Sequence, residues 1–265
     1  MTNQESEWWR NFHVIEMADL FLERSSQAEL DETTNFLIEE LNLKPGMHVY
    51  DQCCGTGTIS FELAKHSISV SGADLCETYI ERAIEVSGRN EPTRSAPPSR
   101  AQLEFHCADA FEFVPDKPCD AVFNWFSSFG YASTNEKNRR MLARAFDSLK
   151  PGCRFTMDVP NFPGLIRGFQ KYMVRTGESN GKSVTCVREC SVNLRSGLLE
   201  QTWNWIVEGR SVDQRKSALR IYFPHEIVEM LTDVGFETIN LYGGLNRSEL
   251  EMDSPRLIVT ARKPA

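Results

Sequence analysis

Gly55 and Gly57 follow a short apolar run and precede a stretch with helical spacing. Because glycine has no Cβ atom, the backbone there can approach a ligand closely, and the first N–H groups of the following helix are free to donate hydrogen bonds. This turn predicts a site for a nucleotide-like molecule. Dinucleotide-binding folds use the same kind of turn, so it does not identify the ligand by itself.

Two carboxylates follow the next two apolar runs. Asp74 ends residues 68–74, where a carboxylate can accept hydrogen bonds from both hydroxyls of an adenosine ribose. Asp109 ends the following run and is expected at the same edge of the sheet, where an adenine would lie. A dinucleotide fingerprint would have its third glycine at position 60, but the residue there is Ser60. The set therefore favours an adenosine-containing ligand over a nicotinamide cofactor.

A parallel sheet must bring these residues together, and the hydrophobic pattern predicts one. Strands are expected at residues 47–51, 68–74, 102–106, 120–126 and 154–159, with helical spacing between most of them. This alternation is typical of a doubly wound α/β fold. Pro224 and Gly235 mark the start and end of a further helix, and strands at 236–242 and 257–261 complete a sheet of seven strands. Residues 91–100, rich in proline and serine, are expected to form a loop.

The pattern changes after the fifth expected strand. Residues 184–194, 199–207 and 216–223 alternate between apolar and polar side chains, which predicts three antiparallel strands. We therefore expect three parts in the chain. These are an N-terminal helical lid (1–45), a Rossmann-like binding domain (46–160 and 224–265), and an inserted antiparallel β cap (161–223).

With these motifs, the chain resembles the class I S-adenosylmethionine-dependent methyltransferases of the small-molecule type, from about residue 32 to the C-terminus. The matching segments are residues 51–57 (DQCCGTG), 72–74 (GAD), 108–110 (ADA), 149–152 (LKPG) and 256–259 (RLIV). Cys53 stands where the family has the first glycine of its motif. The resemblance implies S-adenosylmethionine as cofactor, S-adenosylhomocysteine as product, and methyl transfer to a nitrogen or oxygen atom of a small metabolite.

The resemblance also implies a role for each motif. Asp51 and the backbone of Gly55 and Gly57 would face the methionine moiety of the cofactor. Asp74 would bind the ribose, and Asp109 with Ala110 the adenine. The full set of expected cofactor-binding residues is Asp51, Cys53, Gly55, Gly57, Thr58, Asp74, Leu75, Asp109, Ala110, Asn124 and Phe126.

The small-molecule acceptor is expected on the side of the β cap, next to residues 124–131, which family members place around the transferring methyl. Methyl transfer is an in-line displacement that depends mainly on alignment, and a base helps where the acceptor must lose a proton. Tyr131 and His225 are the candidate catalytic residues. The candidate substrate-binding residues are Trp9, Phe12, Tyr131, Trp203, Arg220 and Tyr222.

Two of these assignments have alternatives. Arg220 can hold a carboxylate or phosphate of the substrate, or it can form an ion pair on the surface. The N-terminal segment, with Trp8, Trp9 and Phe12, can be a lid that folds over bound cofactor or can dock permanently on the core.

Composition narrows the classes of function. A formal net charge of −8 disfavours nucleic acid as a partner. No run approaches the roughly 20 apolar residues that cross a bilayer, and the N-terminus is too polar for a signal peptide, so we expect a cytoplasmic monomer or homodimer without membrane contact. The eight cysteines form no C-x-x-C pair, so no metal site is expected. An NAD-dependent oxidoreductase and a non-catalytic S-adenosylmethionine-binding module remain as alternatives.

Overall fold

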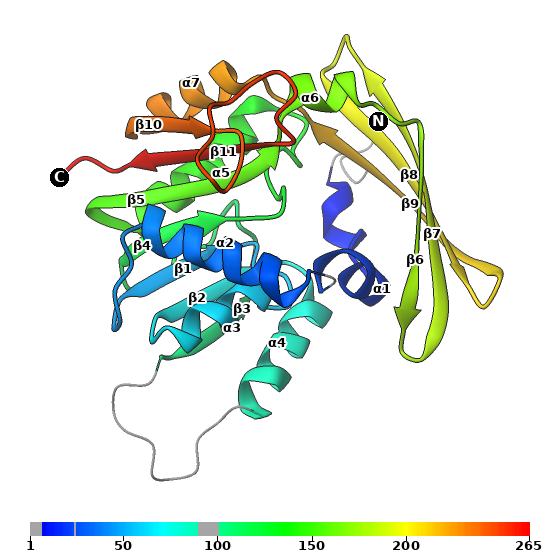
Figure 1. Cartoon of the computed structure of the whole chain (residues 1–265), viewed down its shortest axis with the longest axis horizontal. Helices are drawn as coiled ribbons and strands as arrows, with labels where there is room; N and C mark the ends of the chain where they lie inside the picture. The colour runs from blue at the N-terminus through cyan, green and yellow to red at the C-terminus, as the bar shows by residue number, and fades with distance from the viewer. Residues whose placement is uncertain (1–6, 24, 90–100) are drawn as a thin grey trace.

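Seven strands form the larger of two sheets in this computed structural model, which describes residues 7–23, 25–89 and 101–265 (Figure 1). Their order across the sheet is β10-β11-β5-β4-β1-β2-β3. The strands are β1 (His48–Gln52), β2 (Ser69–Asp74), β3 (Leu103–Cys107), β4 (Cys119–Asn124), β5 (Leu149–Pro160), β10 (Glu237–Tyr242) and β11 (Arg256–Arg262). The loop expected at residues 91–100 lies outside the described residues, as do residues 1–6 of the expected lid.

Strands β1 to β5 run parallel to one another, while β11 pairs antiparallel with both β5 and β10. The carboxyl ends of β1, β2, β3 and β4 therefore lie along one edge of the sheet. This edge is where the glycine turn and the two carboxylates were expected, and the predicted doubly wound α/β sheet is confirmed.

Helices pack on both faces of this sheet because successive side chains of a strand point in opposite directions. Val49 of β1 joins one core cluster with Leu37 and Leu63, whereas the adjacent Tyr50 joins another with Leu142 and Leu231. The helices of this domain are α2 (Gln27–Glu40), α3 (Thr58–Lys65), α4 (Glu77–Arg89), α5 (Asn135–Ser148) and α7 (Pro224–Val234). Gly235 ends α7 with a φ of +110°, as its position after the helical pattern predicts.

A second, antiparallel sheet has the order β6-β7-β8-β9. Its strands are β6 (Tyr172–Ser179), β7 (Lys182–Asn193), β8 (Leu198–Val207) and β9 (Arg210–Arg220), and α6 (Phe162–Arg167) precedes it. Three strands were expected, and β6 was missed because it is an edge strand whose side chains are almost all exposed, so its sequence does not alternate. The third expected strand was also misplaced, because β9 ends at Arg220 and residues 221–223 continue outside it.

The N-terminal segment lies between the two sheets, where Figure 1 draws it in dark blue. It consists of short helical turns, η1 (Trp8–Asn11), α1 (Ile15–Met17) and η2 (Ala18–Leu22). Phe12, Met17 and Leu20 are buried in one cluster with Trp203 and Trp205 of β8. In this structure the segment is therefore docked against the four-stranded sheet. Of the helices in the described parts of the chain, none combines the length and apolarity that crossing a membrane requires.

Candidate functional site

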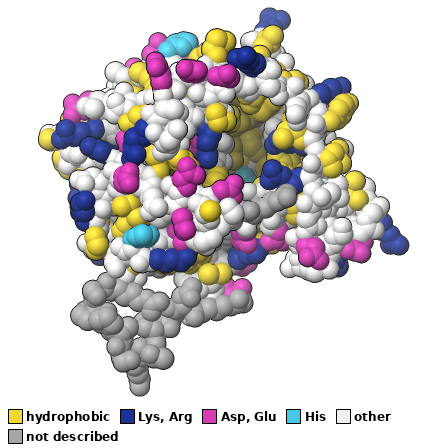
Figure 2. All heavy atoms as spheres, in the orientation of Figure 1, with side chains coloured by type: hydrophobic (Ala, Val, Ile, Leu, Met, Phe, Trp, Pro, Cys, Tyr) yellow, Lys and Arg dark blue, Asp and Glu magenta, His cyan; other side chains and the backbone are white. Residues whose placement is uncertain are grey.

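A cavity of about 340 Å³ lies between the carboxyl edge of the seven-stranded sheet and one face of the four-stranded sheet. Figure 2 shows a hollow in this region with many hydrophobic side chains around it. The lining residues come from the N-terminal segment, the glycine turn after β1, the end of β2 with α4, the loop after β4, the end of β5 with α6, and strands β7 to β9. Residues from the N-terminal segment and from both sheets therefore meet at the cavity.

The glycine turn has three residues with positive φ. Cys53, Gly55 and Gly57 have φ values of +65°, +56° and +82°. A Cβ atom on Gly57 would lie 2.9 Å from the ring of Phe105, so this position requires glycine for space as well as for conformation. Cys53 has a left-handed backbone, an uncommon conformation for a residue with a side chain.

Asp74 fastens this turn to β2. One carboxylate oxygen accepts a hydrogen bond from Gly55 N at 2.9 Å, and the other accepts one from Cys76 N at 2.9 Å. The side chain also lines the cavity. A single carboxylate therefore holds the turn in shape and still faces the space where a ligand would bind.

Asp51 lies deeper in the site, at the end of β1. It is buried and accepts a hydrogen bond from Ser60 Oγ at 2.6 Å. Burial raises the pKa of Asp51 to about 7, with a smaller contribution from the nearby Asp74 carboxylate, while the Ser60 hydrogen bond opposes the shift. The carboxyl therefore changes its charge close to neutral pH.

The expected adenine side of the site is covered by the N-terminal segment. Arg10 Nη2 lies 2.9 Å from Asp109 Oδ2, and the other oxygen of Asp109 accepts a hydrogen bond from Phe111 N at 3.0 Å. Asn124 is buried and donates to Gln52 Oε1 at 3.2 Å. The residues of the expected cofactor set that do not line the cavity are Gly57, Leu75, Asp109, Ala110 and Asn124. Those that do line it are Asp51, Cys53, Gly55, Thr58, Asp74 and Phe126.

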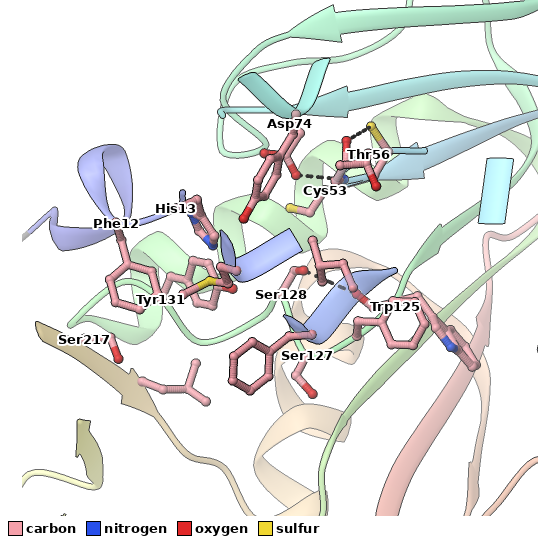
Figure 3. Close-up of a pocket in the computed structure, with 18 of the residues that line it drawn as sticks. Phe12, His13, Cys53, Thr56, Asp74, Trp125, Ser127, Ser128, Tyr131 and Ser217 are labelled. Carbon is pink, nitrogen blue, oxygen red and sulfur yellow. Dashed lines mark hydrogen bonds between the residues drawn. The ribbon is translucent and has the colours of Figure 1, made fainter. Parts of the chain in front are cut away.

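Aromatic rings enclose the middle of the cavity. Tyr131 stacks on His13 with ring centroids 6.1 Å apart, and Phe12 and Tyr79 meet the His13 ring edge to face. Burial raises the pKa of Tyr131, so its phenol keeps its proton at neutral pH. Burial lowers the pKa of His13, although the Asp74 carboxylate opposes this, so the neutral imidazole is favoured. Figure 3 shows His13 and Tyr131 between Asp74 and Ser217.

The face of the four-stranded sheet contributes a polar group within an apolar surround. Trp203 Nε1 donates to Ser217 Oγ at 3.0 Å, and Ser217 Oγ donates to Gln201 Oε1 at 3.1 Å. Arg188 lies beside them, with its guanidinium 4.7 Å from the centre of the Trp203 ring. All four side chains line the cavity.

Four of the predicted acceptor-site residues are not brought to the cavity. His225 is exposed at the start of α7, and Trp9 packs against Phe111 with ring centroids 5.5 Å apart. Arg220 Nη2 donates to the Ser133 carbonyl at 2.6 Å. Tyr222 accepts from Asn138 Nδ2 at 2.8 Å and donates to Asn135 Oδ1 at 3.1 Å. Arg220 and Tyr222 were expected to point into the cavity from one strand, but β9 ends at Arg220, so the alternation does not extend to Tyr222.

Sequence reasoning missed several side chains that do line the cavity. These are chiefly His13, Tyr79, Arg188, Gln201 and Ser217. A signal for Arg188 was present, because it alternates with Cys186 and Cys190 and is thus a charged residue on the buried face of a predicted strand. For His13, the only signal in the sequence was its position next to aromatic residues. Its place in the cavity depends on where the N-terminal segment docks.

Comparison with known proteins gives a family for the central part of the chain. A family model described as a methyltransferase domain matches residues 49–152. The S-adenosyl-L-methionine-dependent Diels-Alderase iccD of Talaromyces variabilis is 31% identical over 117 residues, which is 44% of this chain and 37% of that protein. The chain spans between 10% and 37% of the length of four of the curated relatives that it matches.

Two solved structures share the fold over nearly the whole chain. The CcbJ methyltransferase from Streptomyces caelestis is 18% identical with a TM-score of 0.75, covering 94% of this chain and 96% of that chain. CalS10, an amino pentose methyltransferase from Micromonospora echinaspora with S-adenosylmethionine bound, is 17% identical with a TM-score of 0.65, covering 91% and 93%. At these identities the likeness shows the fold.

Proposed function

We propose, on the premise that this chain belongs to the class I S-adenosylmethionine-dependent methyltransferases, that it transfers a methyl group to a nitrogen or oxygen atom of a small metabolite. The cofactor of this family is S-adenosylmethionine, so the alternative function, a nicotinamide-dependent oxidoreductase, is not proposed. The observation that carries the proposal is the cavity itself, which joins the glycine turn and Asp74 to an aromatic space large enough for a small acceptor.

The proposed cofactor position follows the carboxyl edge of the large sheet. Asp51 and the backbone at Cys53 and Gly55 would hold the methionine end, and Asp74 would hold the ribose. Asp109 would meet the adenine where Arg10 now covers it. The positive sulfonium would then point toward the aromatic middle of the cavity, where ring faces are favourable neighbours for a cation.

The proposed reaction is an in-line displacement. When bound, the cofactor would supply an activated methyl group for attack by the acceptor's nitrogen or oxygen. The sulfur would leave with the electrons of the carbon–sulfur bond, and the acceptor's proton would pass to a base. The cavity's main contributions are alignment and exclusion of water, for which Tyr131 and Trp203 supply packed aromatic walls. His13 is the base that this geometry offers in place of the predicted His225, because it lines the cavity and favours its neutral form.

Two observations support a small acceptor. The cavity has a volume of about 340 Å³ and is bounded on one side by the N-terminal segment and the four-stranded sheet, which suits a compact molecule rather than a polymer. The structural neighbour CalS10 is named as an amino pentose methyltransferase, which is consistent with an acceptor of metabolite size.

The test is to incubate purified protein with S-adenosylmethionine and a panel of small amines and alcohols, and to measure S-adenosylhomocysteine and the methylated product by mass spectrometry. We expect at least one acceptor to give both products in equal amounts, and the Asp74→Ala variant to give neither. If the protein binds S-adenosylmethionine but gives no product with any acceptor, it is a non-catalytic binding module instead.

A further inference from the structure

Three arginines, Arg175, Arg188 and Arg215, lie on the face of the four-stranded sheet that packs against the N-terminal segment. Strand register places them on one face: Arg188 is paired across β8 with Arg215, and Arg175 is paired with Cys186, two residues from Arg188. They come from three different strands, β6, β7 and β9. Two of them have oxygen acceptors within the protein and the third, Arg188, has none in the described part of the chain.

Two of these arginines hold the N-terminal segment. Arg175 Nη1 donates to the Leu20 carbonyl at 3.3 Å, and its guanidinium lies 4.8 Å from the centre of the Phe21 ring. Arg215 is paired with Asp213 at 2.6 Å and donates to the Asn11 carbonyl. Both guanidinium groups therefore have oxygen acceptors within the protein.

Arg188 has no oxygen acceptor in the described part of the chain. Its guanidinium stacks on the Trp203 ring, one Nη atom meets the sulfur of Met173, and the buried Nε has no partner. A thioether is a weak acceptor, and an arginine stays charged in a protein. A partly buried cation with unused donors is costly unless an anion compensates it, whether from the protein or from a ligand.

Arg188 lines the cavity together with two polar side chains, Gln201 and Ser217. It is the one arginine or lysine among the described residues that line the cavity, and Gln201 and Ser217 lie on the same face of the sheet. Because Gln201 Oε1 accepts from Ser217, the amide orientation is fixed, and its NH2 group has only the Cys190 sulfur as a partner, at 3.8 Å. Arg188 and Gln201 thus both carry N–H groups without an oxygen acceptor at this end of the cavity.

The opposite end of the cavity carries negative charge. Asp51 and Asp74 line the glycine turn, where the cationic cofactor is proposed to bind. Figure 3 shows Ser217 on the far side of His13 and Tyr131 from Asp74. A ligand with a negative group would therefore be oriented with that group toward the four-stranded sheet.

We infer that the methyl acceptor carries an oxyanion, a carboxylate or a phosphate, which Arg188 binds in a two-pronged pair with Gln201 assisting. This inference rests on the proposed function, because it assigns the acceptor to this cavity. The anion is held at the four-stranded sheet, and the nucleophilic nitrogen or oxygen extends past Tyr131 toward the sulfonium. Arg188 acts as a substrate-binding residue that sets which acceptors are aligned.

The test measures binding of three small probes to protein saturated with S-adenosylhomocysteine, by ligand-observed NMR titration. The probes are benzoate, phenyl phosphate and the neutral benzyl alcohol, which share one aromatic ring and differ in the attached group. We expect benzoate or phenyl phosphate to bind more tightly than benzyl alcohol, and the better of the two anions identifies whether the natural group resembles a carboxylate or a phosphate.

Variants connect this preference to Arg188. Arg188→Gln removes the charge and should weaken binding of the preferred anion by about tenfold or more, the loss expected for a charge-assisted pair, without changing benzyl alcohol binding. Arg188→Lys keeps the positive charge but loses the two-pronged geometry of the guanidinium, so its affinity for the anion should lie between those of the wild type and Arg188→Gln. Lys216→Gln removes a positive charge from the exposed face of the same sheet and should behave like the wild type.

S-adenosylhomocysteine affinity is measured for each variant first. If it is unchanged in Arg188→Gln and the anion preference is lost, the inference stands. If both anions bind Arg188→Gln as they bind the wild type, or if neither binds better than benzyl alcohol, the inference is overturned while the cofactor site remains. If the wild type does not bind S-adenosylhomocysteine at all, the proposed function fails instead.

Discussion

The two ends of the cavity are constructed differently. At the carboxyl edge of the large sheet, the site is made of backbone in unusual conformations, held by the hydrogen bond between Gly55 N and Asp74. On the four-stranded sheet, the site is made of side chains on regular strands, among them Trp203 and Arg188. A site made of backbone groups changes only when the local fold changes, whereas a side chain on a strand can be substituted without altering the strand. We therefore expect the cofactor end to be intolerant of substitution and the acceptor end to be adjustable.

The N-terminal segment connects the two ends. Trp8 Nε1 donates to the Tyr131 carbonyl at 3.2 Å and to the Ala218 carbonyl of β9 at 3.1 Å. Tyr79 OH of α4 donates to the Val14 carbonyl at 2.9 Å. The segment is thus bonded to the large sheet's loops and to the small sheet at once, so any movement of it would open both ends of the cavity together.

The largest expected effect tests the cofactor end. Asp74→Ala should weaken S-adenosylmethionine binding about 10³-fold, because two charge-assisted hydrogen bonds to the ribose are lost at about 2 kcal/mol each. The measurement is isothermal titration calorimetry. Glu104→Gln, which removes an exposed carboxylate from β3 of the same sheet, is the matched control and should bind normally. A change of less than tenfold for Asp74→Ala would mean that the cofactor does not use this carboxylate.

A second substitution tests the middle of the cavity. His13→Gln should lower kcat about 10²-fold, the lower range for loss of a general base, and leave the cofactor's Kd nearly unchanged. Because burial lowers the pKa of His13, the wild-type kcat, measured at saturating cofactor, should be constant around neutral pH and fall only in acid, and the variant should lack that acid limb. His66→Gln changes an exposed histidine at the end of α3 and should have no effect. An unchanged pH profile in His13→Gln would leave His13 with a packing role only.

The contrast between the two ends also explains what the sequence could predict. The positions of Gly55 and Asp74 could be predicted because they follow from spacing within a strand–turn–helix unit, and the structure brings the two residues within hydrogen-bond distance. The acceptor end depends on how distant parts pack. His13 reaches the cavity only because the N-terminal segment docks between the sheets, and no local pattern encodes that docking.

Strand limits account for the remaining differences. Arg220 and Tyr222 were assigned to one cavity-facing strand, but the chain leaves β9 after Arg220 and turns Tyr222 toward Asn138 of α5. The alternation in β7 places Arg188 on the apolar face of its strand, but the cavity that it lines forms only where the two sheets pack together, which no local pattern encodes. The exact ends of the three expected parts of the chain, and the cofactor roles of individual residues, stay predictions.

A pH titration sharpens the account of the cofactor end. Folding raises the pKa of Asp51 from its ordinary value of 3.8 to about 7, so without cofactor Asp51 holds its proton more strongly in the folded protein than in the unfolded chain. This group's contribution to stability is greatest in acid and is lost as pH rises through about 7. A cationic cofactor ammonium favours the carboxylate, so binding should release a proton and affinity should fall about eightfold from pH 7.5 to pH 6. Asp51→Asn should bind weakly with little pH dependence over this range, and a wild-type affinity that is flat or rises in acid would contradict the pairing.

The smallest expected effect separates two arginines of the four-stranded sheet. Arg220 was predicted to bind substrate, but its guanidinium is used by the Ser133 carbonyl at 2.6 Å, so Arg220→Gln should cost about 1 kcal/mol of stability and leave the acceptor's KM unchanged. Arg188→Gln should do the reverse, raising KM with little loss of stability, because it removes no oxygen-accepted hydrogen bond of the described chain. Thermal unfolding and steady-state kinetics on both variants measure the two effects. If Arg220→Gln raised KM as much as Arg188→Gln, anion binding would belong to the rim of the sheet as well as to its face, and the acceptor end would be wider than the cavity described here.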